Sequence, residues 1–566
     1  RGGDRRLTAS LRIALAQIDP TVGAVADNAA LITHVYREAA QQDVDLVVFP
    51  ELCIAGYPPE DLVLKPAFQR VCRRAVEELA PVTAGGPAMI VGTPWLDGDA
   101  LYNAAVVLQD GEIATWRAKH VLPNYGVFDE VRVFAEGPIP GPVPFPARDG
   151  TMVRLGVLVC EDMWVEDVAE ALEECGAELL LVINGSPFDI EKTEVRLQQA
   201  VARVTETGLA LAYVNQVGGQ DELCFDGASF VLDGDRSRRA QAKSFARDLL
   251  VTDWSPGGSG WTCAPARIEP PLDRQEAMYG AMVLGLRDYV AKNGFPGVVL
   301  GLSGGIDSAL SAAVAVDALG PERVHTLVLP SRYTSPASLE DAEGCARALG
   351  CRVDRMDIEP AVAALNDTLA PLFTGRAPDT TEENIQSRVR GILLMAVSNK
   401  LGPMLLTTGN KSEMSVGYAT LYGDMAGGYS VLKDVYKTAV FELARWRNRH
   451  RPSGALGPAG PVIPVRIIEK PPSAELAEDQ KDEDSLPPYD VLDGILHGLV
   501  EEEQHVDELI ARGFDGDVVR KVVNLLDLAE YKRRQAPPGV KVTQKAFGRD
   551  RRYPITNAFR HLRPKG

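Results

Sequence analysis

Three polar side chains that can together cleave an amide follow apolar, strand-like runs in the first half of the sequence. Glu51 follows the run 45–49, Cys160 follows the run 153–159, and Lys119 lies between them. A thiol needs a base to become a nucleophile, and a buried carboxylate is such a base. A lysine ammonium can stabilise the oxyanion that forms when the thiol attacks a carbonyl. These residues indicate acyl transfer from an amide, through a thioester that water then hydrolyses.

Each of these residues has a simpler interpretation when it is taken alone. A cysteine at the end of an apolar strand is usually an inert core thiol, and Glu51 can cap the turn after Pro50. Lys119 can be a surface lysine whose stem packs on apolar neighbours. Together, however, the segments resemble the carbon–nitrogen hydrolase (nitrilase) superfamily over roughly residues 10–250. The resemblance implies a catalytic triad of Glu51, Lys119 and Cys160 with Glu130 as a second glutamate, in a four-layer α-β-β-α sandwich.

A glycine-rich loop in the second half of the sequence is suited to binding phosphate. Ser303-Gly-Gly-Ile-Asp-Ser308 lies between a strand-like run and a helical pattern. Gly304 and Gly305 let backbone N–H groups approach an anion, and the helix N-terminus adds its dipole. No GxxxxGK[ST] or GxGxxG occurs, which disfavours a P-loop NTPase and a dinucleotide-binding Rossmann site. The alternative is a glycine-rich turn with a serine cap.

The loop resembles that of the ATP pyrophosphatases, in which AMP is transferred to the substrate and diphosphate leaves. Further segments, including 381–390, 406–413 and 417–424, narrow the resemblance to the NAD synthetase family over roughly residues 273–560. That family pattern implies Mg²⁺ on Asp307 and Glu413. It implies ATP contacts from Gly301, Leu302, Ser303, Gly304, Gly305, Ile306, Asp307, Ser308, Thr408 and Lys437. It implies deamido-NAD contacts from Asn384, Glu413, Tyr418, Ala419, Thr420, Leu421 and Lys545. Taken alone, Glu413 could equally lie on a solvated helix face.

The fusion of the two segments implies that glutamine is the nitrogen donor. By similarity to fused NAD synthetases, Tyr125, Ser186 and Lys192 contact glutamine, although a lysine that opens a helix is often only solvated. The expected reaction hydrolyses L-glutamine through a Cys160 thioester and adenylates the carboxylate of deamido-NAD with ATP. Ammonia then displaces AMP, which gives NAD, AMP, diphosphate and glutamate in the last step of NAD synthesis.

Two other functions are compatible with these residues. One is an amidotransferase that applies the same ATP chemistry to another carboxylate or carbonyl. The other is an amidase whose second half is a nucleotide-binding regulatory module. The presence of both Asp307 and Glu413 disfavours the regulatory module, because mere binding does not need a pair of metal-binding carboxylates.

The elements that must position these residues alternate along the chain. Strand-like runs, of which 11–17 is the first, alternate with helical patterns in residues 11–250, which predicts a layered α/β domain. The alternation resumes at residue 273, with helices predicted over 274–292 and 336–349, and predicts a second such domain. Helix-length crossovers in the second half predict a doubly wound parallel sheet. Glycine and proline are frequent near residues 256–272. We therefore predict a glutaminase domain at 8–255, a linker at 256–272 and a synthetase domain at 273–566.

Composition limits the partners. The 566 residues carry a formal charge of −19, which disfavours nucleic-acid binding because phosphate backbones need a surplus of Lys and Arg. No apolar run is long enough to span a membrane, so we predict no membrane association. Eight scattered cysteines without a CxxC pair indicate a reducing cytoplasm. We expect a homo-oligomer whose partners are the small molecules L-glutamine, deamido-NAD and ATP.

Overall fold

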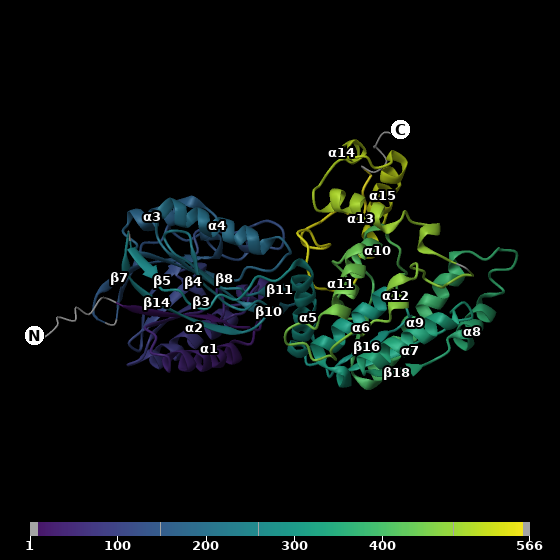
Figure 1. Ribbon diagram of the computed structural model, residues 1–566, viewed down its shortest axis with the longest axis horizontal. Helices are drawn as coiled ribbons and strands as arrows, with labels where there is room; N and C mark the ends of the chain where they lie inside the picture. The colour runs from purple at the N-terminus through teal and green to yellow at the C-terminus, as the bar shows by residue number, and fades with distance from the viewer. Residues whose placement is uncertain (1–9, 148, 259, 479, 559–566) are drawn as a thin grey trace, which may run out of the picture. The chain divides into compact units, whose positions relative to one another are not determined.

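The computed structural model describes residues 10–147, 149–258, 260–478 and 480–558 (Figure 1). The chain divides into two compact units, of which the first comprises residues up to 220 and 224–272. The second comprises residues 221–223 and 273 onward. Residues 8 and 9 of the first predicted domain and 559–566 of the second lie outside the described residues.

Two sheets form the middle of the first unit. The seven-stranded sheet has the order β15 (Gly260–Cys263), β14 (Asp248–Gly257), β1 (Leu11–Gln17), β2 (Leu46–Val48), β3 (Ala88–Asp97), β4 (Ala100–Gln109) and β5 (Glu112–Ala118). The six-stranded sheet has the order β13 (Arg238–Gln241), β12 (Phe230–Leu232), β9 (Leu211–Asn215), β8 (Leu179–Asn184), β7 (Met152–Val159) and β6 (Val143–Pro146). A separate pair joins β10 (Val217–Gln220) and β11 (Leu223–Asp226).

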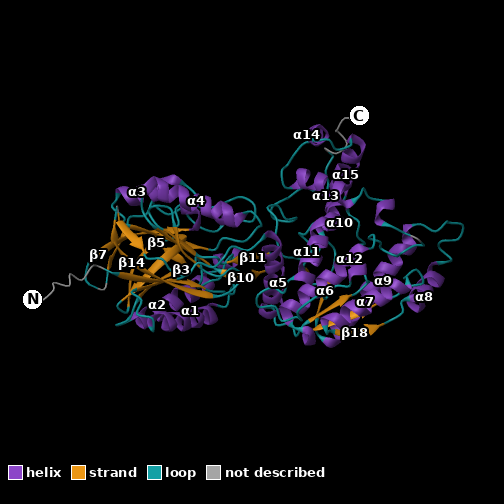
Figure 2. Cartoon of the chain, in the orientation of Figure 1, coloured by secondary structure: helices purple, strands orange, loops and turns teal. Residues whose placement is uncertain are grey.

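Helices cover the outer faces of both sheets, as Figures 1 and 2 show. They are α1 (Val25–Ala40), α2 (Pro66–Leu79), α3 (Glu166–Glu174) and α4 (Lys192–Thr207). Strand β1 illustrates why the layers form, because successive side chains point to opposite faces of a strand. Ile13 and Leu15 enter the core between the sheets, whereas Ala14 and Ala16 pack in the core beneath α1 and α2. The predicted four-layer α-β-β-α sandwich is confirmed.

The second unit contains a five-stranded sheet in which every neighbouring pair is parallel. Its order is β18 (Arg352–Arg355), β17 (Val324–Val328), β16 (Val298–Gly301), β19 (Met404–Thr407) and β20 (Tyr429–Ser430). The strand order reverses between β16 and β19, and ligands of doubly wound sheets bind at the carboxyl ends of strands at such a switch point. The predicted doubly wound sheet is therefore confirmed.

The helices of the second unit begin and end where capping residues stand. Asp273 accepts a hydrogen bond from Glu276 N at the start of α5 (Arg274–Lys292), and Ser335 accepts one from Ser338 N at the start of α7 (Pro336–Leu349). Both helices have the bounds that their sequence pattern predicts. The other helices of this unit are α6 (Ile306–Leu319), α8 (Glu359–Leu369), α9 (Thr380–Leu401), α10 (Lys411–Val416), α11 (Lys437–Arg449), α12 (Val465–Glu469), α13 (Tyr489–Val500), α14 (Val506–Ala511), α15 (Gly516–Leu528) and α16 (Glu530–Arg533).

Part of the predicted linker 256–272 belongs to a sheet. Strand β14 extends to Gly257, and β15 pairs with it in the register Trp254↔Cys263. Trp261 and Cys263 of β15 are buried in the core between the sheets, which is why this glycine-rich segment folds back as a strand. The exact position of the domain boundary stays a prediction.

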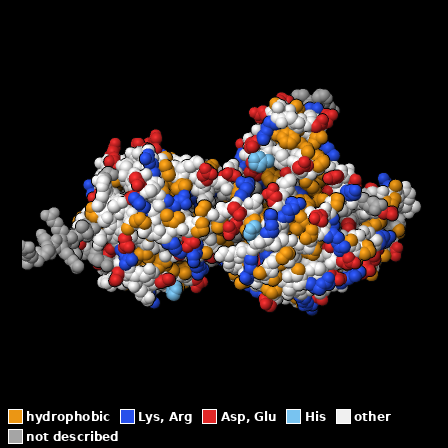
Figure 3. Space-filling view, in the orientation of Figure 1, with side chains coloured by type: hydrophobic (Ala, Val, Ile, Leu, Met, Phe, Trp, Pro, Cys, Tyr) orange, Lys and Arg blue, Asp and Glu red, His pale blue; other side chains and the backbone are white. Residues whose placement is uncertain are grey.

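The surface carries charges of both signs. On the face seen in Figure 3, acidic and basic side chains are interspersed with apolar ones over both units. Among the described residues, no helix combines the length and the apolar character that crossing a lipid bilayer requires.

Candidate active sites

A buried cluster in the first unit joins three of the predicted catalytic residues. Glu51 lies in the loop after β2, Lys119 directly follows β5, and Glu130 opens a 3₁₀ turn. Lys119 Nζ lies 2.7 Å from Glu51 Oε1 and 2.9 Å from Glu130 Oε1. The side chains of Glu51 and Lys119 have no exposed surface. One ammonium group is therefore shared by two carboxylates in a site closed to water.

Burial and charge set the protonation states of this cluster. Burial raises the pKa of Glu130 to about 6, and Lys119 opposes that rise. For Lys119, burial alone lowers the pKa, but the charges of Glu130 and Glu51 outweigh it and hold the pKa well above its usual range. The ammonium group thus stays charged, as a residue that stabilises an oxyanion must.

Cys160 lies at the end of β7, where the chain turns into a short 3₁₀ helix (Cys160–Met163). Its backbone φ of 48° is in the left-handed region, which costs energy for a residue with a side chain and is frequent at active sites. Burial raises the pKa of its thiol, Glu51 raises it further, and Lys119 opposes the rise. The raised pKa keeps the thiol protonated at rest. The charge of Glu51 is one of the causes of that raised pKa.

The residues predicted to bind glutamine lie around this thiol. Tyr125 is half-exposed, and its hydroxyl donates to Glu161 Oε1 at 2.9 Å, next to Cys160. Lys192 begins α4, and its Nζ lies 4.3 Å from the centre of the Trp164 ring. Burial is the main cause that lowers the pKa of Lys192, while Cys160 and Glu161 oppose it. A cation and an anion therefore stand beside the nucleophile.

Ser186 follows β8, and its hydroxyl already has one charged partner. Arg196 Nε donates to Ser186 Oγ at 3.1 Å, while Arg196 Nη1 pairs with Asp226 Oδ1 at 2.7 Å. Because a guanidinium is only a donor, the serine oxygen accepts this hydrogen bond.

The glycine-rich loop of the second unit connects β16 to α6 at the switch point. Gly304 has φ of 81°, and a Cβ there would meet Ser338 O at 2.3 Å, so only glycine fits. Ser303 Oγ accepts from Gly305 N at 3.2 Å and lies 3.1 Å from Ser308 Oγ. Gly305 caps α6, so the first N–H groups of that helix follow the loop. The arrangement is that of an anion-binding strand–loop–helix turn.

Two carboxylates and one lysine lie together beyond this loop. Lys437 Nζ lies 2.5 Å from Asp307 Oδ2 and 3.1 Å from Glu413 Oε1. Asn410, which caps α10, donates to Asp307 Oδ1 at 2.8 Å. Burial is the largest cause that raises the pKa of Glu413 to about 8, with Asp307 adding to it and Lys437 opposing it. The carboxylates of Asp307 and Glu413 thus share the positive charge of one lysine.

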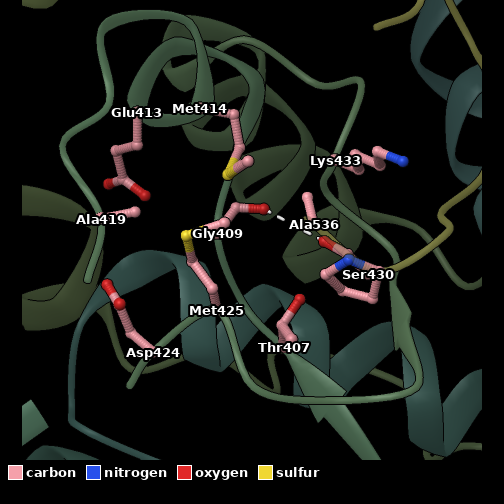
Figure 4. Close-up of a pocket in the computed structure, with 11 residues that line it drawn as sticks. Thr407, Gly409, Glu413, Met414, Ala419, Asp424, Met425, Ser430, Lys433 and Ala536 are labelled. Atoms are coloured by element: carbon pink, nitrogen blue, oxygen red, sulfur yellow. Dashed lines mark hydrogen bonds between the residues drawn. The ribbon is translucent and has the colours of Figure 1, made fainter. Parts of the chain in front are cut away.

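A pocket of the second unit has Glu413 in its lining. Figure 4 shows Glu413 and Asp424 on one side of it, with the sulfur atoms of Met414 and Met425 lining its middle. The remaining lining residues are Thr407, Gly409, Ala419, Ser430, Lys433, Ala536 and Pro537. The pocket thus combines apolar walls with a few acidic groups, as ligand sites do.

The residues predicted to contact deamido-NAD are only partly brought together. Glu413 and Ala419 line the pocket, and Thr420 Oγ1 donates to Asn384 Oδ1 at 3.0 Å. Tyr418 and Leu421 are the chain neighbours of Ala419 and Thr420. The backbone oxygen of Leu421 accepts a hydrogen bond from Arg388 Nε at 3.2 Å. Thr408 lies between the pocket residues Thr407 and Gly409. Lys545 Nζ instead pairs with Glu503 Oε1 at 2.7 Å, away from the pocket lining.

Several residues of these sites escape the sequence analysis. Asn103 and Tyr57 contact the buried carboxylates of the first unit from a strand and a loop whose patterns give no polar signal. Asp482 is buried and accepts from Tyr489 OH at 2.9 Å, although it lies in an acidic run typical of a solvated loop. Asn410 could have been found, because Asn410 and Glu413 have the spacing of a capping box.

Comparison with known families places a different family model on each unit. The model described as carbon-nitrogen hydrolase matches residues 12–259, and that described as NAD synthase matches residues 278–536.

Full-length relatives carry both parts. The glutamine-dependent NAD(+) synthetase of Rhodobacter capsulatus is 53% identical over 555 residues, covering 98% of this chain and 100% of that protein. The protein of the same name from Thermotoga maritima is 42% identical and covers 97% of this chain and 99% of that protein. The structure of glutamine-dependent NAD+ synthetase from Acinetobacter baumannii with ADP has a TM-score of 0.77 and 43% identity, and covers 97% of this chain and 99% of that one.

Proposed function

The chain belongs to the glutamine-dependent NAD(+) synthetases, and from that premise we propose which of its residues carry each half of the reaction. The enzyme hydrolyses glutamine and uses the ammonia to amidate deamido-NAD after ATP-dependent adenylation. The observation that carries the assignment of the first half is the buried cluster in which Lys119 bridges Glu51 and Glu130 beside Cys160.

Glutamine hydrolysis begins with transfer of the Cys160 proton to Glu51 as the sulfur attacks the side-chain amide carbon. Lys119 stabilises the oxyanion, because its charge is fixed by two carboxylates and is shielded from water. Glu51 then gives its proton to the leaving nitrogen, which departs as ammonia. In the second half of the cycle Glu51 takes a proton from water, which attacks the thioester. The C–S bond breaks, glutamate is released, and Glu51 returns the proton to the Cys160 sulfur.

Recognition of the amino-acid part of glutamine rests on complementary charges. Lys192 is placed to attract the α-carboxylate and Glu161 the α-ammonium group, with Tyr125 holding Glu161 in position. Ser186 is also assigned to glutamine, and Arg196 holds its hydroxyl in position by donating to the serine oxygen. These assignments predict a preference for the zwitterionic amino acid over simple amides.

Synthesis of NAD is assigned to the switch point of the second unit. The backbone N–H groups of residues 303–308 bind the ATP phosphates at the N-terminus of α6. Lys437 and Thr408 contact ATP, while Asn384, Tyr418–Leu421 and Glu413 form the deamido-NAD side next to the pocket. Lys545 is retained as a weaker contact to that substrate, which requires it to leave Glu503.

The residues present fit a magnesium ion. Asp307 and Glu413 share a single ammonium group, and the raised pKa of Glu413, caused first by its burial, reflects this shortage of positive charge. Carboxylate oxygens are ligands that Mg²⁺ prefers. Bound there, the ion would neutralise charge on the leaving diphosphate. Asn410 holds Asp307 in place for that role.

We further propose that the enzyme is a cytoplasmic homo-oligomer. Ile392 and Leu401 of α9 are 63% and 56% exposed, Ala396 between them is exposed as well, and the other apolar side chains of that stretch are half-buried. A second copy of the chain is the occupant expected for this face. All eight cysteines are unpaired, as a reducing compartment favours.

The proposed chemistry is tested by a product assay. Deamido-NAD, ATP and either glutamine or ammonia are supplied, and NAD is quantified together with the nucleotide products. We expect NAD from both nitrogen sources with AMP and diphosphate in equal amounts to NAD. Formation of ADP and phosphate would contradict adenylation at the 303–308 loop.

A further inference from the structure

Asn103 is a neutral side chain that lies between the two carboxylates of the glutaminase cluster. It belongs to β4, has no exposed surface, and its Nδ2 donates to Glu51 Oε1 at 2.7 Å. The same amide nitrogen lies 3.3 Å from Glu130 Oε2. The two hydrogens of one NH₂ group thus serve one carboxylate each.

The backbone of Asn103 also holds the lysine of this cluster. Lys119 N donates to Asn103 O at 2.7 Å, at the end of the β4–β5 hairpin. Asn103 Oδ1 is buried and has no hydrogen-bond partner among the described residues. An unpartnered buried acceptor destabilises a fold, so the amide is retained at a cost in stability.

The other described groups beside Glu51 either carry a charge or already donate a hydrogen bond to one of the two carboxylates. Gly185 N donates to Glu51 Oε2 at 2.8 Å, and Lys119 is shared with Glu130. Tyr57 OH donates to Glu130 Oε1 at 2.9 Å. The remaining ionisable neighbours of Glu51 are the Cys160 thiol and Glu161, whose ionised forms both repel a second negative charge.

The charge balance of the cluster gives Asn103 its importance. Two carboxylates and one ammonium group leave one negative charge without a counter-charge in a dry site. Hydrogen bonds to the ionised form of a carboxylate favour that form, and a neutral donor does so without adding a charge that would compete with Lys119. Without the amide, the pair of carboxylates would take up a proton at higher pH.

We propose that Asn103 is a positioning residue of the glutaminase, whose amide orients Glu51 as the base for Cys160 and stabilises the negative charge of the Glu51 and Glu130 pair. The inference rests on the proposed roles of Glu51 and Cys160. It assigns to β4 a contribution to the acid–base chemistry that is separate from the charge supplied by Lys119.

The test is the pH profile of glutaminase kcat for Asn103→Leu, which keeps the side-chain shape and removes the donor. We expect the acid limb to move up by about one pH unit, as the loss of one hydrogen bond to a charged group predicts. At pH values on the acid limb kcat falls about tenfold by the same conversion, whereas on the plateau above it kcat approaches that of the wild type, and the KM for glutamine stays within about twofold. Thermal unfolding of the full chain reports on folding in the same preparation.

Thr83→Val is the matched control. Thr83 is also fully buried, and its hydroxyl accepts from Gly111 N at 3.0 Å, at the turn that closes the other end of the same β4–β5 hairpin. This variant loses a buried polar group without touching either carboxylate, so its acid limb should coincide with that of the wild type.

A second variant guards against failure of the first to fold. Asn103→Asp is nearly isosteric and places a third carboxyl group in the cluster, so its acid limb should move up at least as far. An unchanged or lowered acid limb in the folded variant overturns the role of Asn103. If Glu51→Gln keeps full glutaminase activity, the proposed function itself is wrong, so the two failures are distinguishable.

Discussion

Replacement of Lys119 by methionine removes the ammonium group that Glu51 and Glu130 share in their buried cluster. Its Nζ lies 2.7 Å from one carboxylate oxygen and 2.9 Å from the other, with no exposed side-chain surface. Removing one partner of such a pair typically costs about 3–5 kcal/mol, because a buried charge is left without compensation. For a unit of this size we expect a decrease of about 6–10 °C in the midpoint of thermal unfolding.

The loss of stability should depend on pH in a defined direction. In the variant both carboxylates are buried without a cation, so their pKa values in the folded state rise above those in the unfolded state. Groups of this kind destabilise the fold increasingly as pH rises from the unfolded pKa to the folded pKa. The pKa of Glu130, raised by burial, is already about 6 with Lys119 present. The deficit relative to wild type should therefore be larger at pH 8 than at pH 5.

Thermal unfolding of the full chain at these two pH values, combined with glutaminase turnover, is the assay. We expect turnover to fall by about 10²–10³-fold, as for loss of an oxyanion donor. The exposed Lys65→Met is the control, and it should change neither quantity. An equal deficit at both pH values would refute the shared-cation interpretation, and so would turnover close to that of the wild type.

Three further changes test other parts of the molecule. Asp307→Asn should abolish NAD synthesis from both glutamine and ammonia, and a variant that still uses ammonia at the wild-type rate would contradict the proposed magnesium site. Ser186→Ala should raise the KM for glutamine about tenfold, the effect of losing one hydrogen bond, while ammonia-dependent synthesis stays unchanged. Ile392→Glu places a charge on the exposed face of α9 and should reduce the mass measured by light scattering, whereas an unchanged oligomer would exclude that face as an interface.

The sequence was sufficient to predict helices and strands whose bounds are set by residues within or next to the element itself. Helices α5 and α7 have the predicted bounds because Asp273 and Ser335 cap their first turns and Gly350 ends α7 with a left-handed φ of 70°. Strand β1 was predicted in full because both its faces are largely buried and all of its residues except Arg12 and Gln17 are apolar. The triad residues were found because they follow such strands.

Contacts between distant residues could not be predicted in this way. Asn103 lies in an apolar strand, and its importance appears only when β4 brings it to Glu51 from 52 residues away. Asp482 lies in an acidic run that is typical of a solvated loop, but it is buried, and it contacts Tyr489 and interacts with the charge of Lys437. Burial raises its pKa, which Lys437 opposes. The left-handed turn at Cys160 likewise depends on packing around it, since cysteine has no preference for that conformation.

The most direct test of the division of labour between the two units is the nitrogen requirement of Cys160→Ala. The variant retains Asp307, Glu413 and Lys437, whose contacts lie within the second unit. We predict that it makes no NAD from glutamine but makes NAD from ammonia at the wild-type rate. Loss of both activities in a variant that unfolds at the wild-type temperature would contradict the account, as would undiminished synthesis from glutamine.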